Sequence, residues 1–168
     1  MIISGNVIAH KVFGDGKELG DNVSCTLPSI ETATSELKGA GILGTIDAPS
    51  LGQINSLSFE MSQRSLNKES VQLLAPGIHN IELRFAKEVM SGNGTTIPEG
   101  TKIFISGMTK KLDPGKIETA ATMDGSIEFE VIRYRIVIAG KEVLLIDKLN
   151  YIYKINGVDY LQKVKAAL

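Results

Sequence analysis

The 168 residues fit one domain of ordinary size, and 43% apolar with 22% charged residues are enough for a packed core. Eighteen Lys and Arg against nineteen Asp and Glu give a net charge of −1, which argues against a general nucleic-acid binder. No apolar run approaches the ~18 residues of a membrane span, and the N-terminus lacks the charged segment of a signal peptide. We therefore expect a single domain over residues 1–168, made and folded in a cytoplasm.

Alternation of apolar and polar residues predicts that most of the chain forms β-strands. In residues 53–63, Leu57, Phe59 and Met61 fall on one face, and serines and a glutamate fall on the other. The two last and longest segments meet at Gly140 and predict the strongest hairpin. In chain order, the expected strands cover residues 6–13, 23–27, 53–63, 78–89, 102–112, 126–139 and 141–155.

The apolar pattern of residues 126–139 changes phase by one position between Val131 and Ile132. Such a shift turns every later side chain to the other face of a sheet unless a bulge absorbs it. This strand therefore either carries a bulge there or passes from one packing surface to another. Residues 143–153 are apolar on both faces, which predicts cover on both sides, within a sandwich or by a neighbouring subunit.

Two short helices are expected besides the strands. Residues 67–75 offer Asn67 as an N-cap and end at the stop signal Pro76-Gly77. Residues 157–168 offer Asp159 as the cap of a C-terminal helix. The elements together predict a mainly β fold: an antiparallel β-sandwich or barrel with one short inserted α-helix and a C-terminal helix.

Residues 39–52 form a Gly-rich segment with a single charge, Asp47, and four large aliphatic residues. Gly and Pro interrupt regular structure, so an extended apolar loop is expected here. Because loops in water are usually polar, such a loop suggests a surface that another chain covers. The alternative is that the loop folds back over its own core. The candidate interface residues are Gly39, Gly41, Ile42, Leu43, Gly44, Ile46 and Leu51.

Few residues suggest catalysis or cofactor binding. His10 and His79 are far apart and no HExxH or CxxC spacing occurs, so no metal or cofactor is expected. Cys25 is the only cysteine, which excludes an intrachain disulfide and predicts a small buried residue in a strand. Glu128 and Glu130 share a strand face and could act as acid and base, but a solvated face or the lining of an aqueous channel gives the same pattern.

Short stretches spread over nearly the whole chain carry a resemblance to a known family. They are Thr26-Leu27-Pro28, Glu36–Gly41, Gly44, Ala48-Pro49, Leu51-Gly52, Leu57–Glu60, Gly140–Val143, Ile146-Asp147 and Asn156–Asp159. In order and spacing these stretches are similar to the major tail tube proteins of contractile-tailed phages and to the R-type bacteriocins derived from such tails. Residues 65–70 depart from the family pattern.

The resemblance implies a non-enzymatic structural subunit without cofactors, which forms hexameric rings stacked into a hollow tube. Long strands from all subunits of a ring build an inner barrel in that family, and a contractile sheath surrounds it. Tape-measure and baseplate proteins are further implied partners. DNA is implied only as a transient cargo of the lumen, with membrane puncture as the other use of such a tube. The implied location is a virion tail or a phage-tail-like particle, assembled in the bacterial host cytoplasm.

In such a tube, the apolar segment 39–52 is the expected ring-stacking element. The expected lumen wall is the polar strand face with Ser56, Ser58, Glu60 and Ser62. Because this face lacks Lys and Arg, a polyanion is expected to slide past it without adhering. Two alternatives stay open: a type VI secretion tube protein of the same architecture, and a small β-barrel enzyme or ligand-binding domain that uses Glu128 and Glu130.

Overall fold

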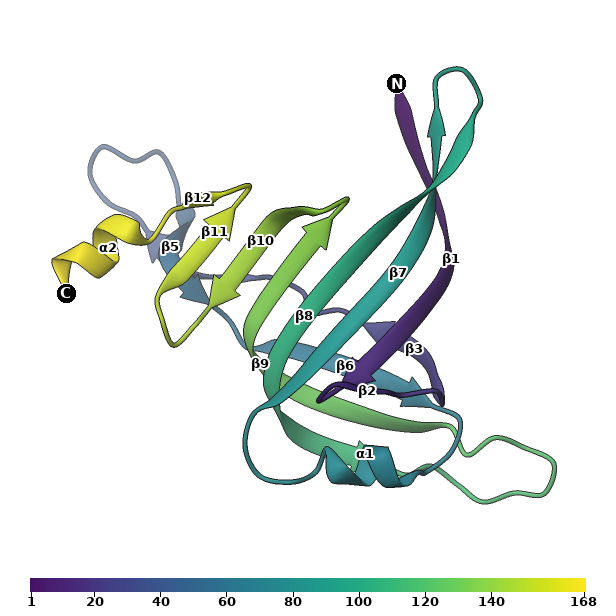
Figure 1. Cartoon of the computed structure of the whole chain (residues 1–168). Coiled ribbons are helices and arrows are strands. Elements are labelled where there is room, and N and C mark those ends of the chain that lie inside the picture. Colours follow the sequence, from purple (N-terminus) through teal and green to yellow (C-terminus); the bar gives the residue numbers. More distant parts are fainter.

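Antiparallel strands make up most of the computed structural model, which describes residues 1–168 (Figure 1). The strands are β1 (Ile2–Gly14), β2 (Lys17–Glu18), β3 (Asn22–Thr26), β4 (Thr32–Leu37), β5 (Ile46–Ile54), β6 (Leu57–Gln63), β7 (His79–Ser91), β8 (Thr96–Asp113), β9 (Gly125–Ile138), β10 (Lys141–Asp147), β11 (Ile152–Ile155) and β12 (Val158–Asp159). The helices are α1 (Lys68–Gln72) and α2 (Gln162–Ala167). The predicted mainly β fold with two short helices is confirmed.

Long strands bend and take part in two packed sheets. The main strand order is β12-β11-β10-β9-β8-β7-β1-β2, and β3 and β6 join it because β6 pairs with β9. Residues 125–131 of β9 pair with β6, whereas residues 133–138 pair with β10. Thus β8 and β9 run from a four-stranded sheet, ordered β3-β6-β9-β8, into a larger sheet that packs over it. The expected sandwich is confirmed, and the alternative of a closed barrel is wrong because the sheets keep open edges.

The core lies between these two sheets. Its central pair is Phe59 of β6 and Phe129 of β9, which are directly cross-strand and whose rings stack with centroids 5.9 Å apart. The larger sheet and α1 supply Val12, Leu73, Ile81, Leu83, Ile103, Ile105, Tyr134 and Ile146. Since alternate residues of β6 and β9 are buried in this core, the residues between them share the opposite, outer face of the four-stranded sheet.

The predicted phase change in β9 is a β-bulge at Ile132. Ser106 pairs with Arg133 and Gly107 pairs with Val131, so Ile132 has no partner on β8. The Ile132 carbonyl instead accepts the backbone N–H of Lys148 at 3.1 Å. At this point the pairing partner of β9 also changes from β6 to β10. Both interpretations of the phase change are therefore correct.

Two predicted elements near the C-terminus differ from the structure. Residues 141–155 are not one strand, because the Asp147 carboxylate accepts the backbone N–H groups of Leu149 and Asn150 and turns the chain between β10 and β11. The expected helix over residues 157–168 begins later, at Gln162, because Val158 and Asp159 first pair with β11. Asp159 is not its cap: the Asp159 carboxylate accepts the backbone N–H of Leu161, which itself occupies the N-cap position.

Helix α1 fills one side of the sandwich, at the end of β8. Asn67 caps it as predicted, accepting the Ser70 backbone N–H at 2.8 Å. Leu73, directly after the helix, is buried in the core, and its carbonyl accepts the Thr109 hydroxyl of β8 at 2.5 Å. Neither helix has the length and apolar character that a membrane span requires.

His79 fastens the end of this helical segment to the sheet. Its Nδ1 lies 2.7 Å from the Asp15 carboxylate and its Nε2 lies 2.7 Å from the Ala75 carbonyl oxygen. Both neighbours are acceptors, so both ring nitrogens donate when the imidazole is protonated. The hydrogen bond to Asp15 outweighs the opposing effect of burial and raises the pKa of His79.

Candidate assembly surfaces

The segment predicted as an apolar loop over residues 39–52 is largely a β-hairpin. β4 and β5 pair with each other in a separate two-stranded sheet, so residues 46–52 are strand and only residues 38–45 form a turn. We call these eight residues the hairpin tip. The hairpin extends from the body beside α2 (Figure 1). The correction has a physical reason: Pro49 and Gly52 are tolerated in a strand that pairs on one side only.

The base of this hairpin is anchored, but its tip is free. Leu161 is buried against Gly52, where an added Cβ would lie 2.6 Å from a Leu161 methyl group. In contrast, Leu43 is fully exposed, and Ile46 and Leu51 are 51% and 66% exposed. These aliphatic residues are therefore not part of the buried core of their own subunit.

The predicted alternation of β6 is confirmed and produces a polar outer face. Leu57, Phe59 and Met61 are at most 1% exposed, so the residues between them face away from the core. On β9, Ser126, Glu128 and Glu130 stand opposite them and extend the same surface. We define the polar face as Ser56, Ser58, Glu60, Ser62, Ser126, Glu128 and Glu130 together with Lys110 of β8.

Hydrogen bonds and ion pairs connect the groups of the polar face. The Ser56 hydroxyl donates to Glu130 at 2.7 Å and the Ser58 hydroxyl donates to Glu128 at 2.9 Å. The Lys110 ammonium lies 3.3 Å from both carboxylates. The expectation that this face lacks Lys and Arg is therefore wrong. A bulge in β8 between Thr109 and Lys111 turns the side chain of Lys110 to this face, and Lys111 stands directly opposite Glu128. The sequence did not indicate Lys110, because its strand position alone does not show the bulge.

This network lowers the pKa of both glutamates. At Glu128 the hydrogen bond from Ser58 is the largest cause, followed by Lys110. At Glu130 burial opposes the change, but the bonds from Ser56 and Lys110 still lower the pKa. An acid–base pair needs one carboxyl whose pKa is raised toward neutrality, whereas both of these are ionised. The arrangement therefore suits a hydrated wall better than general acid catalysis.

The four-stranded sheet that carries the polar face has two open edges. β3 pairs only with β6, so its other edge is free. At the opposite side, β7 starts at His79 opposite Gly107, so residues 108–113 of β8 pair only with β9. Unpaired strand edges expose rows of N–H and C=O groups that can add another strand.

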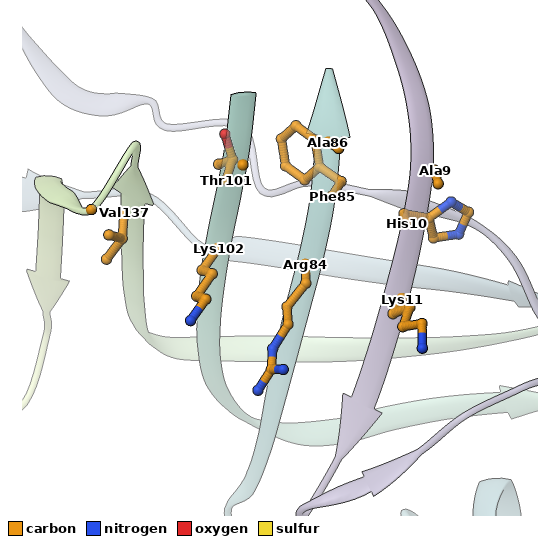
Figure 2. Close-up of a pocket in the computed structure, with 11 residues that line it drawn as sticks. Ala9, His10, Lys11, Arg84, Phe85, Ala86, Thr101, Lys102 and Val137 are labelled. Atoms are coloured by element: carbon orange, nitrogen blue, oxygen red, sulfur yellow. The ribbon is translucent and has the colours of Figure 1, made fainter. Parts of the chain in front are cut away.

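The larger sheet carries a different surface on its outside. Lys11, Arg84 and Lys102 are successive cross-strand partners on β1, β7 and β8, and they point the same way (Figure 2). They border a hollow of about 380 Å³ that Ala9 and Val137 help to line. Arg84 is held by Glu82 at 2.6 Å, whereas Lys102 makes no ion pair. No local sequence pattern indicates this basic row, because its members lie far apart in the chain.

Histidine and cysteine side chains are not gathered at any of these surfaces in a way that suggests chemistry. No three His, Cys, Asp or Glu side chains form a group that could hold a metal ion. Cys25 lies half-buried in β3, and burial raises the pKa of its thiol to about 11. His10 is exposed and hydrogen-bonds to Asn22 at 3.0 Å.

Comparisons with known proteins point in one direction. A family model described as phage tail tube protein FII matches residues 6–168. The tail tube protein of Escherichia phage P2 is 27% identical over 143 residues, which cover 83% of this chain and 82% of that protein. The major tail tube protein of Serratia phage KSP20 is 27% identical over 171 aligned positions, which cover 100% of this chain and 98% of that protein.

Two solved structures share the fold. One is a chain of the baseplate of the anti-feeding prophage, with a TM-score of 0.50, 8% identity, and coverage of 82% of this chain and 95% of that chain. The other belongs to the sheath–tube complex of an extracellular contractile injection system in the extended state. Its TM-score is 0.53 at 14% identity, covering 80% of this chain and 91% of that chain.

Proposed function

Because the chain belongs to the phage tail tube protein FII family and is a structural tube subunit, we propose that its copies close into hexameric rings that stack into a hollow conduit. One observation carries this proposal: a four-stranded sheet has a hydrated outer face, a buried inner face and two open edges. A sheet closed around an axis has no edges and encloses a lumen. In this role the chain is not an enzyme, and it needs no cofactor.

Ring closure joins the β3 edge of one copy to the β8 edge of the next. The two edges are similar in length, since β3 spans the five residues Asn22–Thr26 and the free part of β8 spans residues 108–113. They also match in direction: neighbours in β3-β6-β9-β8 are all antiparallel, so β8 runs opposite to β3. Closure thus continues the antiparallel alternation around the ring.

The polar face lines the lumen. Glu60, Glu128 and Glu130 stand beside Lys110 and Lys111, and serine hydroxyls fill the remaining positions. Lys110 is paired with two of these carboxylates, and Lys111 lies directly opposite Glu128. A wall of this kind stays wet and binds a polyanion weakly, because Lys and Arg contacts to phosphate supply most of the affinity for nucleic acids. DNA is therefore a transient cargo, and membrane puncture is the other use of the conduit.

The hairpin tip holds successive rings together. Leu43 and its aliphatic neighbours lose contact with water when another ring covers them, at about 1.5–3 kcal/mol for each fully buried side chain. The larger sheet, on the side away from the polar face, faces outward to a contractile sheath. Baseplate and tape-measure proteins are partners at the ends and in the lumen of a virion tail or phage-tail-like particle, which assembles in the bacterial host cytoplasm.

Negative-stain electron microscopy of the purified protein tests the proposal. The expected result is six-membered rings, or tubes of uniform width, at high protein concentration. Analytical ultracentrifugation over a range of concentrations and salts supplies the matching mass. A monomer at every concentration and salt contradicts the proposal.

A further inference from the structure

The gap between the two sheets of the sandwich is filled at one edge of the four-stranded sheet and open at the other. At the β8 edge of the four-stranded sheet, the gap between the sheets is filled by α1 and by Leu73. At the β3 edge, the gap is open and forms a cleft of about 260 Å³. Seven of the nine residues that line the cleft are apolar: Val7, Val23, Cys25, Leu27, Leu83, Phe85 and Ile103; the others are His10 and Ser24.

Two strands border the cleft without closing it. No backbone hydrogen bond joins β1 to β3; their link is the side-chain bond from His10 to Asn22 at 3.0 Å. Both strands are irregular here, with register shifts in β1 around Val7 and in β3 between Asn22 and Ser24. The rim is apolar, and the side chains of Val7 and Val23 are about half exposed. In an isolated subunit, this rim therefore exposes apolar surface to water.

The α1 segment carries a second unpartnered apolar surface. Its inner side is occupied by Leu73 and by Ser70, which donates to Gln63 at 2.6 Å. Leu66, Val71 and Leu74 lie outside this contact and are each about 45% exposed. No part of the same chain covers them, and together with Asn67 and Lys68 they line a shallow surface hollow.

The sheet topology relates these two surfaces. Both lie on the core side of the same four-stranded sheet, and the cleft opens at its β3 edge. The N-cap Asn67 of α1 donates to Asp21, just before β3, whereas the C-terminal end of α1, with Leu73, reaches the β8 edge. If the β8 edge of one copy continues the sheet at the β3 edge of another, the C-terminal end of α1 of the first copy is carried to the mouth of the cleft of the second. The contact is heterologous, because each copy offers the C-terminal end of α1 at one side and the cleft at the other, so it can close into a ring.

We propose that the cleft between β1 and β3 receives the apolar side of α1, with Val71 and Leu74 at its centre, from the neighbouring copy in the ring. The occupant is thus a second copy of this chain, and the contact completes at each junction a core that one subunit leaves open. This inference rests on the proposed ring but goes beyond it, since a ring joined through strand edges alone needs no such contact.

Disulfide trapping tests the proposal directly. All proteins carry Cys25→Ala to remove the native thiol and Leu43→Asp to keep rings from stacking. The test protein adds Val23→Cys and Leu74→Cys, and the matched control adds Val23→Cys and Leu149→Cys, since Leu149 is an exposed leucine far from α1 on the β10–β11 turn. After mild oxidation at ring-forming concentration, the test protein is expected to give a non-reducing gel ladder that ends at the ring's full number of subunits, and the control is expected to stay monomeric.

Each other outcome has a defined meaning. Rings visible in the microscope without a ladder, or an equal ladder from the control, overturn the contact between α1 and the cleft and leave the proposed tube intact. If the wild-type chain forms no rings, both the contact between α1 and the cleft and the proposed tube are contradicted.

A charge exchange gives a second readout that does not depend on disulfide geometry. Val23→Glu and Leu74→Lys are each expected to disperse rings into folded monomers, and the double variant is expected to restore rings. Failure of the double variant to restore rings, with both single variants folded and dispersed, contradicts the proposal.

Discussion

The polar face and the hairpin tip are both exposed, but they relate to water in opposite ways. On the polar face, each carboxylate of Glu128 and Glu130 has a hydroxyl donor and an ammonium partner within the same subunit. At the hairpin tip, Leu43 has no partner within the subunit at all. The carboxylates of Glu128 and Glu130 are paired within a monomer, whereas Leu43 is shielded from water only when another molecule covers it. Exposure alone therefore does not identify an interface. An exposed group indicates an interface when it lacks a favourable partner within its own subunit, as the Leu43 side chain does.

The largest expected effect is the loss of assembly on adding a charge to the hairpin tip. Leu43→Asp places a carboxylate in the ring-to-ring contact, where burial without a partner is costly, so long tubes should disappear. The melting temperature of the subunit should stay nearly unchanged, because Leu43 is fully exposed. Electron microscopy and thermal unfolding check the two parts. If the variant unfolds, the tip supports its own core; if tubes persist, the tip does not stack rings.

Replacing a buried leucine beneath the polar face should lower the stability of the subunit, in contrast to a substitution at the hairpin tip. Leu57 is completely buried, so Leu57→Ala should lower the free energy of unfolding by about 2–5 kcal/mol. The matched change Leu43→Ala should cost less than about 0.5 kcal/mol, as surface substitutions usually do. Urea denaturation of both variants measures the difference. Equal losses of stability would contradict the contrast between the two regions.

A smaller effect concerns pH and lies outside both surfaces. The folded-state pKa of His79 is raised, so the stabilisation it gives is full below the unfolded value of about 6.5 and is lost as pH rises through the folded value. The urea midpoint of the wild-type chain should therefore fall over this range, and His79→Gln should flatten the fall. A profile that His79→Gln leaves unchanged would show that another group is responsible.

The smallest expected effect is on the polar face itself. Lys110→Met removes the ammonium shared by two carboxylates, so the pKa values of Glu128 and Glu130 should rise toward ordinary values. Stability should change little, because exposed ion pairs contribute little. Carboxyl titration by NMR measures the pKa values, with Lys116→Met, an exposed loop lysine, as control. Unchanged pKa values would mean that Lys110 is not part of the network in solution.

The alternation along β6 predicted both its buried residues and the positions of the polar face, since period-two patterns depend only on local backbone geometry. The phase change at Ile132 likewise predicted either a bulge or a change of packing surface, and the structure has both. The resemblance to tail tube proteins is confirmed by the family match over residues 6–168.

What the sequence did not predict depends on contacts made at a distance. The sequence did not predict the pairing of β4 with β5, because Pro49 and Gly52 are residue types typical of loops. Lys110 reaches the polar face only because a bulge in β8 turns it there. The cleft and the outer side of α1 become related only through the strand order of the sheet, which no local pattern encodes.

The central claim is that the polar face lines the lumen of a tube, and chemical labelling tests it most directly. Ser58→Cys and Glu60→Cys report on the polar face and Lys102→Cys on the outside of the larger sheet, all with Cys25→Ala. A bulky maleimide should label positions 58 and 60 quickly in free subunits and far more slowly in tubes, while position 102 keeps its rate. If positions 58 and 60 are labelled as quickly in tubes as in free subunits, the polar face does not line the lumen.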